Sequence, residues 1–207
     1  MKALLRAELR TIQHLMNDGL THAARSFSQM VGQEISVSMP HCVTDPTVVA
    51  NAIDYSSATL TRLVTHIMGE LPGLSYLLLS EYESSTLQRT CLPTSLGTDE
   101  QVAVGRAFLE EIDNVISAAV ITRLSEALDA HMYGGVPHWV NQPKDLIRDS
   151  LKKDLAQLRG GRHLRVYARF HFEEDPLLQP QFLWVLSPEF LRRATHCLNS
   201  APSDISP

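Results

Sequence analysis

Apolar residues recur at spacings of three and four in two long stretches of the chain, which correspond when the sequence is shifted by 97 residues. That spacing is the period of one buried face of an α-helix. It predicts two long helices, at about residues 3–31 and 99–130, with matching core faces. The coinciding apolar positions are Ile12, Leu15, Gly19, Ala23, Phe27 and Val31 in the first stretch and Leu109, Ile112, Ile116, Val120, Leu124 and Leu128 in the second.

The segments that follow the two predicted helices also correspond. EISVSMP ends at Pro40 and HMYGGVP ends at Pro137, and both are typical of short strands. Residues 61–82 predict a hairpin that turns at Pro72-Gly73, with a short helix continuing to about Leu92. In residues 163–190 an alternation of apolar and polar side chains predicts strands with one buried face. Its apolar members are Leu164, Val166, Ala168, Phe170 and Phe172, and its polar members are Arg165, Tyr167, Arg169 and His171.

The second half contains about ten additional residues, around QPKDLIRDSLKKDLAQLRGG at 142–161. Pro143 at its start, leucines at helical spacing and Gly160-Gly161 at its end predict an added amphipathic helix. Its basic residues Arg148, Lys152 and Lys153 are expected to face solvent.

These elements predict an α/β (α+β) fold in which one antiparallel sheet is shared by two pseudo-symmetric, internally duplicated halves. The sheet packs against the two long helices, with additional short helices. We expect one domain at residues 1–198, made of halves at about 1–97 and 98–198, and a loose polar tail at 199–207.

Composition narrows the classes of function. The chain of 207 residues is 44% hydrophobic and carries a formal net charge of −5, which disfavours a nucleic-acid partner. Charges at Arg6, Glu8 and Arg10 interrupt any secretory apolar segment, and no uncharged run is long enough to span a bilayer, so we expect a cytoplasmic protein that binds no membrane. The three cysteines are widely spaced, which favours buried free thiols, and the sequence predicts no metal site.

Two polar pairs lie nearly opposite the predicted core faces. They are His14 with Asn17 on the first helix and Glu111 with Asn114 on the second, each three residues apart and therefore on one helical face. In both halves 22 residues separate the Asn from the following proline. The neighbours Glu110 and Asp113 are interpreted as ordinary surface charges.

The motif Glu111, Asn114 and Pro137 resembles that of the CheC, CheX and FliY chemotaxis phosphatases, in which Glu and Asn precede Pro at these intervals. Ala107 departs from the Asp or Ser that the family usually has four residues before the Glu. The segment NDGLTHAARSFSQMVGQEISVSMP is similar to the family's first copy, and GELPGLSYLLLSEY to its glycine-linked hairpin. The resemblance extends over about residues 10–198.

The resemblance implies hydrolysis of the aspartyl phosphate of a CheY-like response-regulator receiver domain. Asn114 would orient the attacking water, and Glu111 would pair with the active-site Lys of the partner. The chain itself would bind no cofactor, and the Mg²⁺ would be held by the receiver. A CheD-like protein is a further partner that the resemblance suggests.

The first half departs from the motif because His14 replaces the Glu, although Asn17 and Pro40 are kept. A histidine does not pair with a Lys as a carboxylate does, and Arg10 adds positive charge, so this second site is expected to be degenerate. The loss of this motif leaves open an alternative, an adapter that binds a phosphorylated regulator or a CheD-like protein without efficient catalysis.

Overall fold

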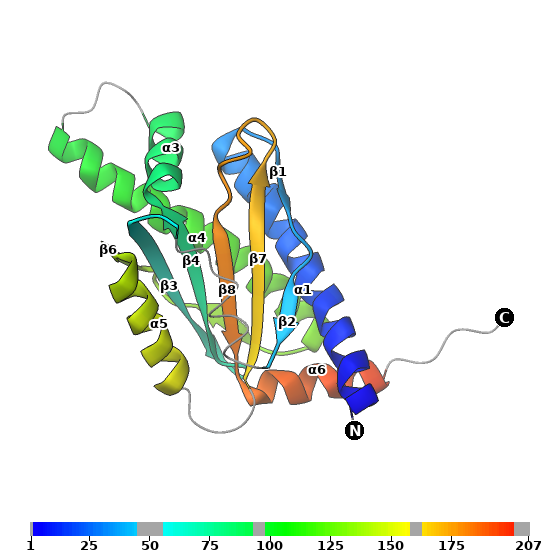
Figure 1. Ribbon diagram of the computed structural model, residues 1–207. Helices are drawn as coiled ribbons and strands as arrows, with labels where there is room; N and C mark the ends of the chain where they lie inside the picture. Colours follow the sequence, from blue (N-terminus) through cyan, green and yellow to red (C-terminus); the bar gives the residue numbers. More distant parts are fainter. Residues whose placement is uncertain (1, 45–55, 93–97, 158–162, 201–207) are drawn as a thin grey trace.

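Two long helices form one layer of the protein. The computed structural model describes residues 2–44, 56–92, 98–157 and 163–200. Helices α1 (Lys2–Val31) and α4 (Thr98–Leu128) pack against each other behind the sheet (Figure 1). They approach closely at Gly19, where a Cβ atom would lie only 3.3 Å from Cγ1 of Val120. Both predicted core faces are confirmed, although Leu15 and Val31 at the margin of the first are half-buried.

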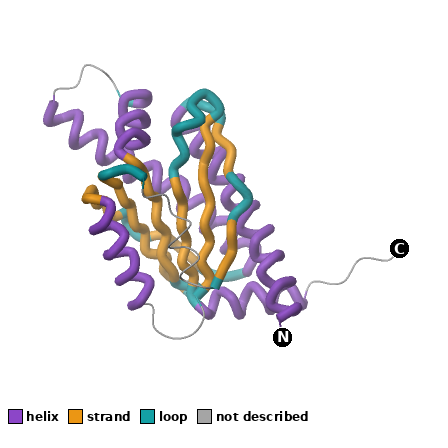
Figure 2. Tube along the Cα trace, viewed as in Figure 1, coloured by secondary structure: helices purple, strands orange, loops and turns teal. Residues whose placement is uncertain are grey.

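A single antiparallel sheet forms the second layer, and Figure 2 shows its strands side by side. Its strands are β1 (Ile35–Val37), β2 (His41–Val43), β3 (Thr59–Gly69), β4 (Gly73–Ser80), β5 (Met132–Gly134), β6 (His138–Pro143), β7 (Leu164–Phe172) and β8 (Gln181–Leu186). The order is β1-β7-β8-β4-β3-β5, with β2 also paired to β7 and β6 to β3.

The central pair β4–β8 joins the two halves of the chain. On either side of it the corresponding strands take corresponding places, because β1 and β2 pair with β7 while β5 and β6 pair with β3. The predicted α/β fold with one shared antiparallel sheet is confirmed. Its origin by internal duplication stays a prediction.

Helix α5 (Lys144–Gln157) covers part of the other face of the sheet, where it contacts β3 and β6. The prediction that β7 has one buried face was wrong at Arg165 and Tyr167, which are buried, whereas Arg169 and His171 are half-buried. Ile147 and Leu151 of α5 form a second apolar cluster with sheet residues that include Tyr76 and Leu183. Tyr167, on the polar side of the predicted alternation, also belongs to it and is 6% exposed. The second apolar cluster thus extends onto the face of β7 that the pattern assigned to solvent, which the sequence of the strand alone does not reveal.

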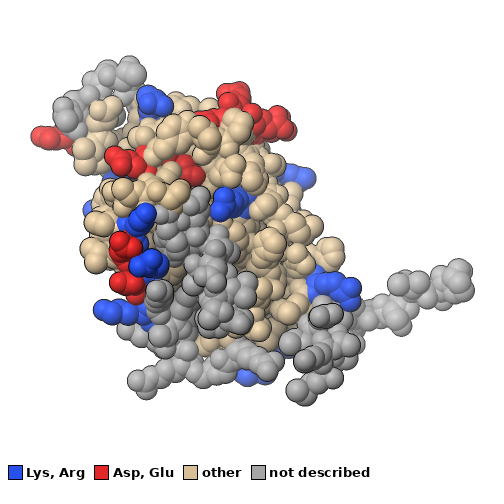
Figure 3. All heavy atoms as spheres, in the orientation of Figure 1, with Lys and Arg blue, Asp and Glu red and all other residues tan. Residues whose placement is uncertain are grey.

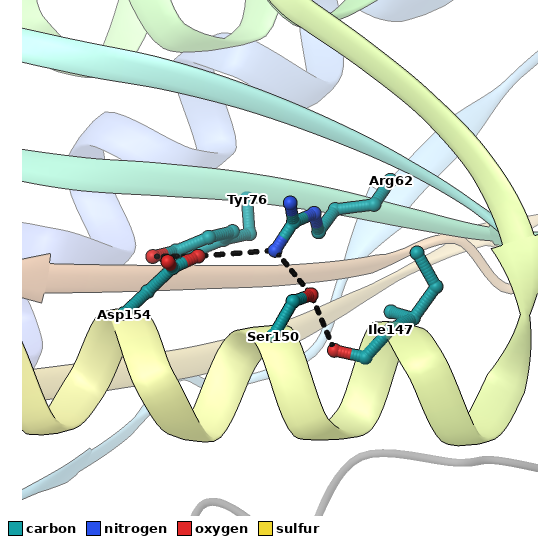
Figure 4. A network of polar contacts seen from close by, with 5 residues as sticks. All are labelled: Arg62, Tyr76, Ile147, Ser150 and Asp154. Carbon is teal, nitrogen blue, oxygen red and sulfur yellow. Dashed lines mark hydrogen bonds and ion pairs between the residues drawn. The ribbon is translucent and has the colours of Figure 1, made fainter.

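A polar network fixes α5 to the sheet (Figure 4). Nη1 of Arg62 on β3 donates to Oγ of Ser150 at 2.8 Å and to Oδ2 of Asp154 at 3.0 Å. The hydroxyl of Tyr76 donates to the same carboxylate oxygen at 3.4 Å. The Arg62 side chain is only 12% exposed, so Asp154 balances a charge that is largely removed from water.

On its outer surface α5 carries charges of both signs. Arg148 pairs with Asp145 at 3.1 Å, and both side chains are exposed. Figure 3 shows acidic and basic side chains next to one another over this helix. The expected solvent exposure is therefore confirmed for Arg148, and Lys153 is exposed as well.

Two shorter helices complete the fold. Helix α3 (Glu81–Cys91) begins with a capping box, in which Ser80 and Glu83 each accept a hydrogen bond from the other's backbone N–H. Helix α6 (Pro188–Ser200) follows β8. The predicted turn at Pro72-Gly73 and the helix that ends near Leu92 are confirmed.

The three cysteines are free thiols, as expected, but they are half-buried, whereas full burial was predicted. Within the part of the chain that the structure describes, none of the helices has the length and apolar character needed to cross a bilayer. The predicted loose tail falls mostly at residues 201–207, outside the described residues.

Candidate functional site

The middle of α4 presents Glu111 and Asn114 to solvent. Both side chains are exposed, whereas Ile112 and Ile116 on the opposite side of the helix are fully buried. The predicted exposure of the pair is therefore confirmed. Nδ2 of Asn114 donates to Oε2 of Glu111 at 3.4 Å, a long and exposed contact. Such a contact is weak, so either side chain can be redirected towards a partner at small cost.

A shallow depression of about 670 Å³ lies beside this pair and brings Pro137 to it. Its helical wall contains Ala107, Glu110, Glu111 and Asn114, and its other wall runs from β5 into the following loop. The members of that second wall and of its rim are Met68, Tyr133, Gly134, Gly135, Val136 and Pro137. The structure thus unites the three motif residues, Glu111, Asn114 and Pro137, which are 26 positions apart at most in the chain.

Exposed apolar side chains surround the depression. Val136 is 88% exposed, Tyr133 48% and Met68 38%. A single exposed apolar residue is common on protein surfaces, but three of them around one depression that also holds an amide and a carboxylate are typical of a protein-binding surface.

A close approach of backbones holds β5 in place against β3. Gly69, at the end of β3, has φ of 103°, and a Cβ atom there would collide with the backbone carbonyl of His131. Next to it, the N–H of Glu70 donates to the carbonyl of His131 at 2.9 Å, and the N–H of His131 donates to Oε1 of Glu70 at 2.9 Å. Only glycine fits this position, and the resulting contact fixes the strand that leads to the depression.

Arg106 lies one turn of α4 before the acidic residues. Its Nε forms an ion pair with Oε1 of Glu110 at 2.9 Å, and its guanidinium carbon lies 5.2 Å from the ring centroid of Trp139 on β6. Glu110 therefore is a half-buried surface residue whose charge is neutralised locally. This leaves Glu111 as the exposed carboxylate next to Asn114.

Asp113 corrects the sequence analysis, because it is not a surface charge. Its side chain is 0% exposed, and Oδ2 accepts a hydrogen bond of 2.6 Å from the hydroxyl of Thr65 on β3. Burial raises the pKa of the Asp113 carboxyl from 3.8 to about 7, an effect that the hydrogen bond from Thr65 partly offsets. The helix turns Asp113 inward although its neighbours Glu111 and Asn114 face outward.

The polar position was missed because apolar spacing alone defined the core face. A usable signal exists in retrospect: Asp113 and Ser117 are four residues apart, immediately beside Ile112 and Ile116, so they share the inward side of α4.

The corresponding face of the first half has a similar framework with different chemistry. His14 is exposed and Asn17 is half-buried on α1. Gln13 donates from Nε2 to the carbonyl of Pro40 at 2.8 Å, so this proline is also tied to the helix. Met39 beside it is 51% exposed. The structure therefore places His14 and Asn17 on one side of α1, where an imidazole replaces the carboxylate of the second half.

A larger cavity, about 890 Å³, lies on the opposite side of the sheet. Its lining includes Arg62, Tyr76 and Asp154 of the α5 network together with the apolar side chains of Val64 and Val185. Its size alone does not connect it with the motif, whose amide and carboxylate lie at the shallower depression. Among the described residues no group of three or more His, Cys, Asp or Glu side chains is arranged to hold a metal ion.

No protein-family model and no curated protein matches the sequence. Solved structures do match the fold. FliY from Thermotoga maritima superposes with a TM-score of 0.67 at 16% identity, over 93% of this chain and 96% of that one. CheX in the CheX–CheY–BeF3–Mg²⁺ complex from Borrelia burgdorferi gives 0.56 at 11% identity, over 82% and 95%. FliM in its complex with SpeE from H. pylori gives 0.56 at 9% identity, over 96% and 98%. The fold implied by the resemblance to CheC, CheX and FliY is thus confirmed.

Proposed function

We propose that this chain, which has the fold of the FliY and CheX chemotaxis proteins, hydrolyses the aspartyl phosphate of a CheY-like receiver domain. The observation that carries the proposal is the exposed Glu111–Asn114 pair, which stands beside Pro137 at an open depression. The site offers a surface and not a deep pocket. That shape suits a folded protein substrate whose phosphorylated residue is itself recessed.

Asn114 would supply the catalysis. A carboxamide can donate and accept hydrogen bonds at once, so it can hold a water molecule in line with the acyl phosphate without acting as a base. Phosphoryl transfer depends mainly on such positioning and on electrostatic stabilisation. Because the contact between Asn114 and Glu111 is 3.4 Å long, the amide can leave it when a partner arrives.

Glu111 would set the orientation of the partner by pairing with the receiver's active-site Lys. Charge pairs of this kind contribute more to specificity and register than to affinity. The Mg²⁺ that neutralises phosphoryl charge would be held by the receiver. Arg106 and Glu110 form an ion pair beside Glu111 and Asn114. Glu111 is therefore the carboxylate that remains available to pair with the Lys of the receiver.

The apolar rim would provide most of the docking energy. Met68, Tyr133 and Val136 are exposed in the free chain and surround the depression. Burying such side chains against an apolar surface of the receiver is favourable by about 25 cal/mol for each Å² removed from water. The first-half face lacks a carboxylate at His14, so we expect Asn17 to contribute little to catalysis.

A second candidate function is a binding protein with little catalysis. The same fold occurs in FliM, whose solved structure is a complex with SpeE, so the fold is also found in a protein assembly. In this alternative the chain would hold a phosphorylated regulator or a CheD-like protein. Ala107 at the family's Asp or Ser position and His14 at its Glu position are the residues that favour it.

The experiment is phosphate release from receiver domains charged with acetyl phosphate, using a panel of receivers from the same organism. We expect the wild type to accelerate release and Asn114→Ala to lose most of that acceleration. Glu111→Ala should weaken docking and raise KM. Asn141→Ala, which removes an exposed amide from β6, is the matched control.

Three results would count against the proposal. Full activity of Asn114→Ala would disprove the assigned site, and a large loss in Asn17→Ala would move the site to the first half. Binding of a charged receiver without accelerated release would support the binding protein instead.

A further inference from the structure

The buried carboxyl of Asp113 occupies the same helical turn as the two proposed functional side chains. Glu111 precedes it by two residues and Asn114 follows it directly. Oδ2 of Asp113 accepts the hydrogen bond from Thr65 at 2.6 Å, whereas its buried Oδ1 has no hydrogen-bond partner among the described residues. A short hydrogen bond at a buried site is stronger than one at the surface.

This bond belongs to a small polar contact between α4 and the centre of the sheet. One turn further along the helix, Oγ of Ser117 and Oγ of Ser75 are 2.9 Å apart, and both side chains are buried. Thr65 and Ser75 are directly opposite each other in the β3–β4 ladder. Two successive turns of α4 are therefore hydrogen-bonded to two neighbouring strands, in the midst of an apolar core.

Thr65 also lies close to the second wall of the depression. A Cβ atom at Gly134, which lines the depression, would lie 3.4 Å from Cγ2 of Thr65. The strand that carries Gly134 pairs with β3 two residues beyond Thr65, at Ile67. Thr65 therefore bonds α4 through its hydroxyl, and its methyl group lies near Gly134 of the opposite wall.

Packing alone does not account for an acid at this position. An apolar side chain of similar volume would fill the space without the cost of desolvating a carboxyl and without an unpartnered oxygen. Burial raises the pKa of Asp113 to about 7, which shows how large that cost is for the ionised form. An apolar residue, however, could not form a directional hydrogen bond. Such a bond fixes how this turn of α4 is rotated and how far it lies from β3.

We propose that Asp113 is a positioning residue, whose buried hydrogen bond to Thr65 holds Glu111 and Asn114 at a fixed place relative to the Gly134–Pro137 wall. The inference rests on the proposed phosphatase function and specifies how that site is held. A water-orienting amide must be placed to within a fraction of an ångström of its working geometry, so a small rotation of this turn reduces the rate.

The test compares one substitution that removes the hydrogen bond between Thr65 and Asp113 with three substitutions that serve as controls. Thr65→Val removes the hydroxyl and keeps the shape, and Thr65→Ser keeps the hydroxyl. Asp113→Asn keeps an acceptor oxygen for Thr65 and cannot ionise. Ser75→Ala removes the neighbouring buried hydrogen bond between Ser75 and Ser117. The substituted residue lies on β4, so the sequence of α4 is not altered.

We expect Thr65→Val to lower kcat for the charged receiver by about tenfold or more while KM changes little. Thr65→Ser and Asp113→Asn should retain most of kcat, and Ser75→Ala should retain kcat although it lowers the melting temperature. A structural role alone would predict that Thr65→Val and Ser75→Ala behave alike. Unchanged kcat in Thr65→Val, or an equal loss in Ser75→Ala, would overturn the positioning role.

A second readout does not depend on activity. The side-chain amide signals of Asn114 in ¹⁵N NMR spectra, assigned through Asn114→Ala, report the environment of that side chain directly. They should shift in Thr65→Val and keep their position in Ser75→Ala and Thr65→Ser. If the wild type proves inactive with every receiver, the proposed function fails, but these shifts still decide whether Asp113 positions the turn. Signals that stay in place in Thr65→Val would refute the inference.

Discussion

The substitution Asp113→Asn should remove a large pH dependence from the stability of the protein. In the folded chain burial raises the pKa of the Asp113 carboxyl to about 7, against 3.8 for the unperturbed group. Between these two values the folded chain keeps a proton that the unfolded chain has released. The free energy of unfolding therefore falls as the pH rises from about 4 to about 7 and is constant with respect to this group above that range.

The size of the effect follows from the two pKa values. Between pH 5 and pH 8, the free energy of unfolding of the wild type changes relative to that of the variant only up to the folded-state pKa near 7. This interval covers about two pH units. At about 1.4 kcal/mol for each unit, the wild type should lose about 3 kcal/mol relative to the variant. This is an upper value, because relaxation and water entry around an ionised Asp113 reduce the penalty.

The assay is urea unfolding of both proteins at pH 5, 6, 7 and 8, followed by the fluorescence of the buried Trp184 and by circular dichroism. The difference between wild type and variant at each pH cancels the titration of all groups that the two proteins share. At pH 5 the variant should be the less stable protein, because its amide places an unpartnered N–H₂ in the core. At pH 8 the free energy of unfolding of the variant should be higher, relative to that of the wild type, than it is at pH 5. Parallel stability curves from pH 5 to 8 would refute the raised pKa and the burial from which it follows.

Three further predictions concern other parts of the structure. Asp154→Ala should lower the free energy of unfolding by about 1–3 kcal/mol, because the buried guanidinium of Arg62 loses its counter-ion, and denaturant unfolding will measure this. Gly69→Ala should be at least as damaging, since a Cβ there meets a facing backbone carbonyl, and a melting temperature equal to that of the wild type would contradict the described β3–β5 contact. Val136→Ser should raise KM for the charged receiver several-fold and leave kcat and stability unchanged, whereas Leu177→Ser, equally apolar and 76% exposed, should leave all three unchanged.

Much of the fold could be predicted because its local signals are strong. The periodicity that places Leu109, Ile112 and Ile116 on one side of α4 is a property of neighbouring residues and needs no tertiary information. The same holds for the outward direction of Glu111 and Asn114, which follows from helix geometry once the core side is known. Turn residues such as Gly73 similarly marked the β3–β4 hairpin.

The candidate site was only partly predictable, because local signals do not show how segments far apart in the chain pack together. The fixed interval to Pro137 indicated which residues belong together, but the depression between them depends on how β5 lies against β3. That arrangement requires the contact of Gly69 with the backbone of His131, which joins residues far apart in the chain. The apolar rim at Met68 likewise comes from a strand that the motif does not include.

The sequence by itself determined the two long helices, the antiparallel hairpins and the side of α4 on which the proposed functional pair lies, because each depends on the spacing of neighbouring residues. Only the tertiary structure decided that α5 covers part of the second face of the sheet and that Thr65 donates a hydrogen bond to Asp113. Both are consequences of which surfaces meet. A side chain near the margin of a helical face becomes buried or exposed according to the element packed beside it, and Asp113 is buried where α4 lies against β3 and accepts a hydrogen bond from Thr65.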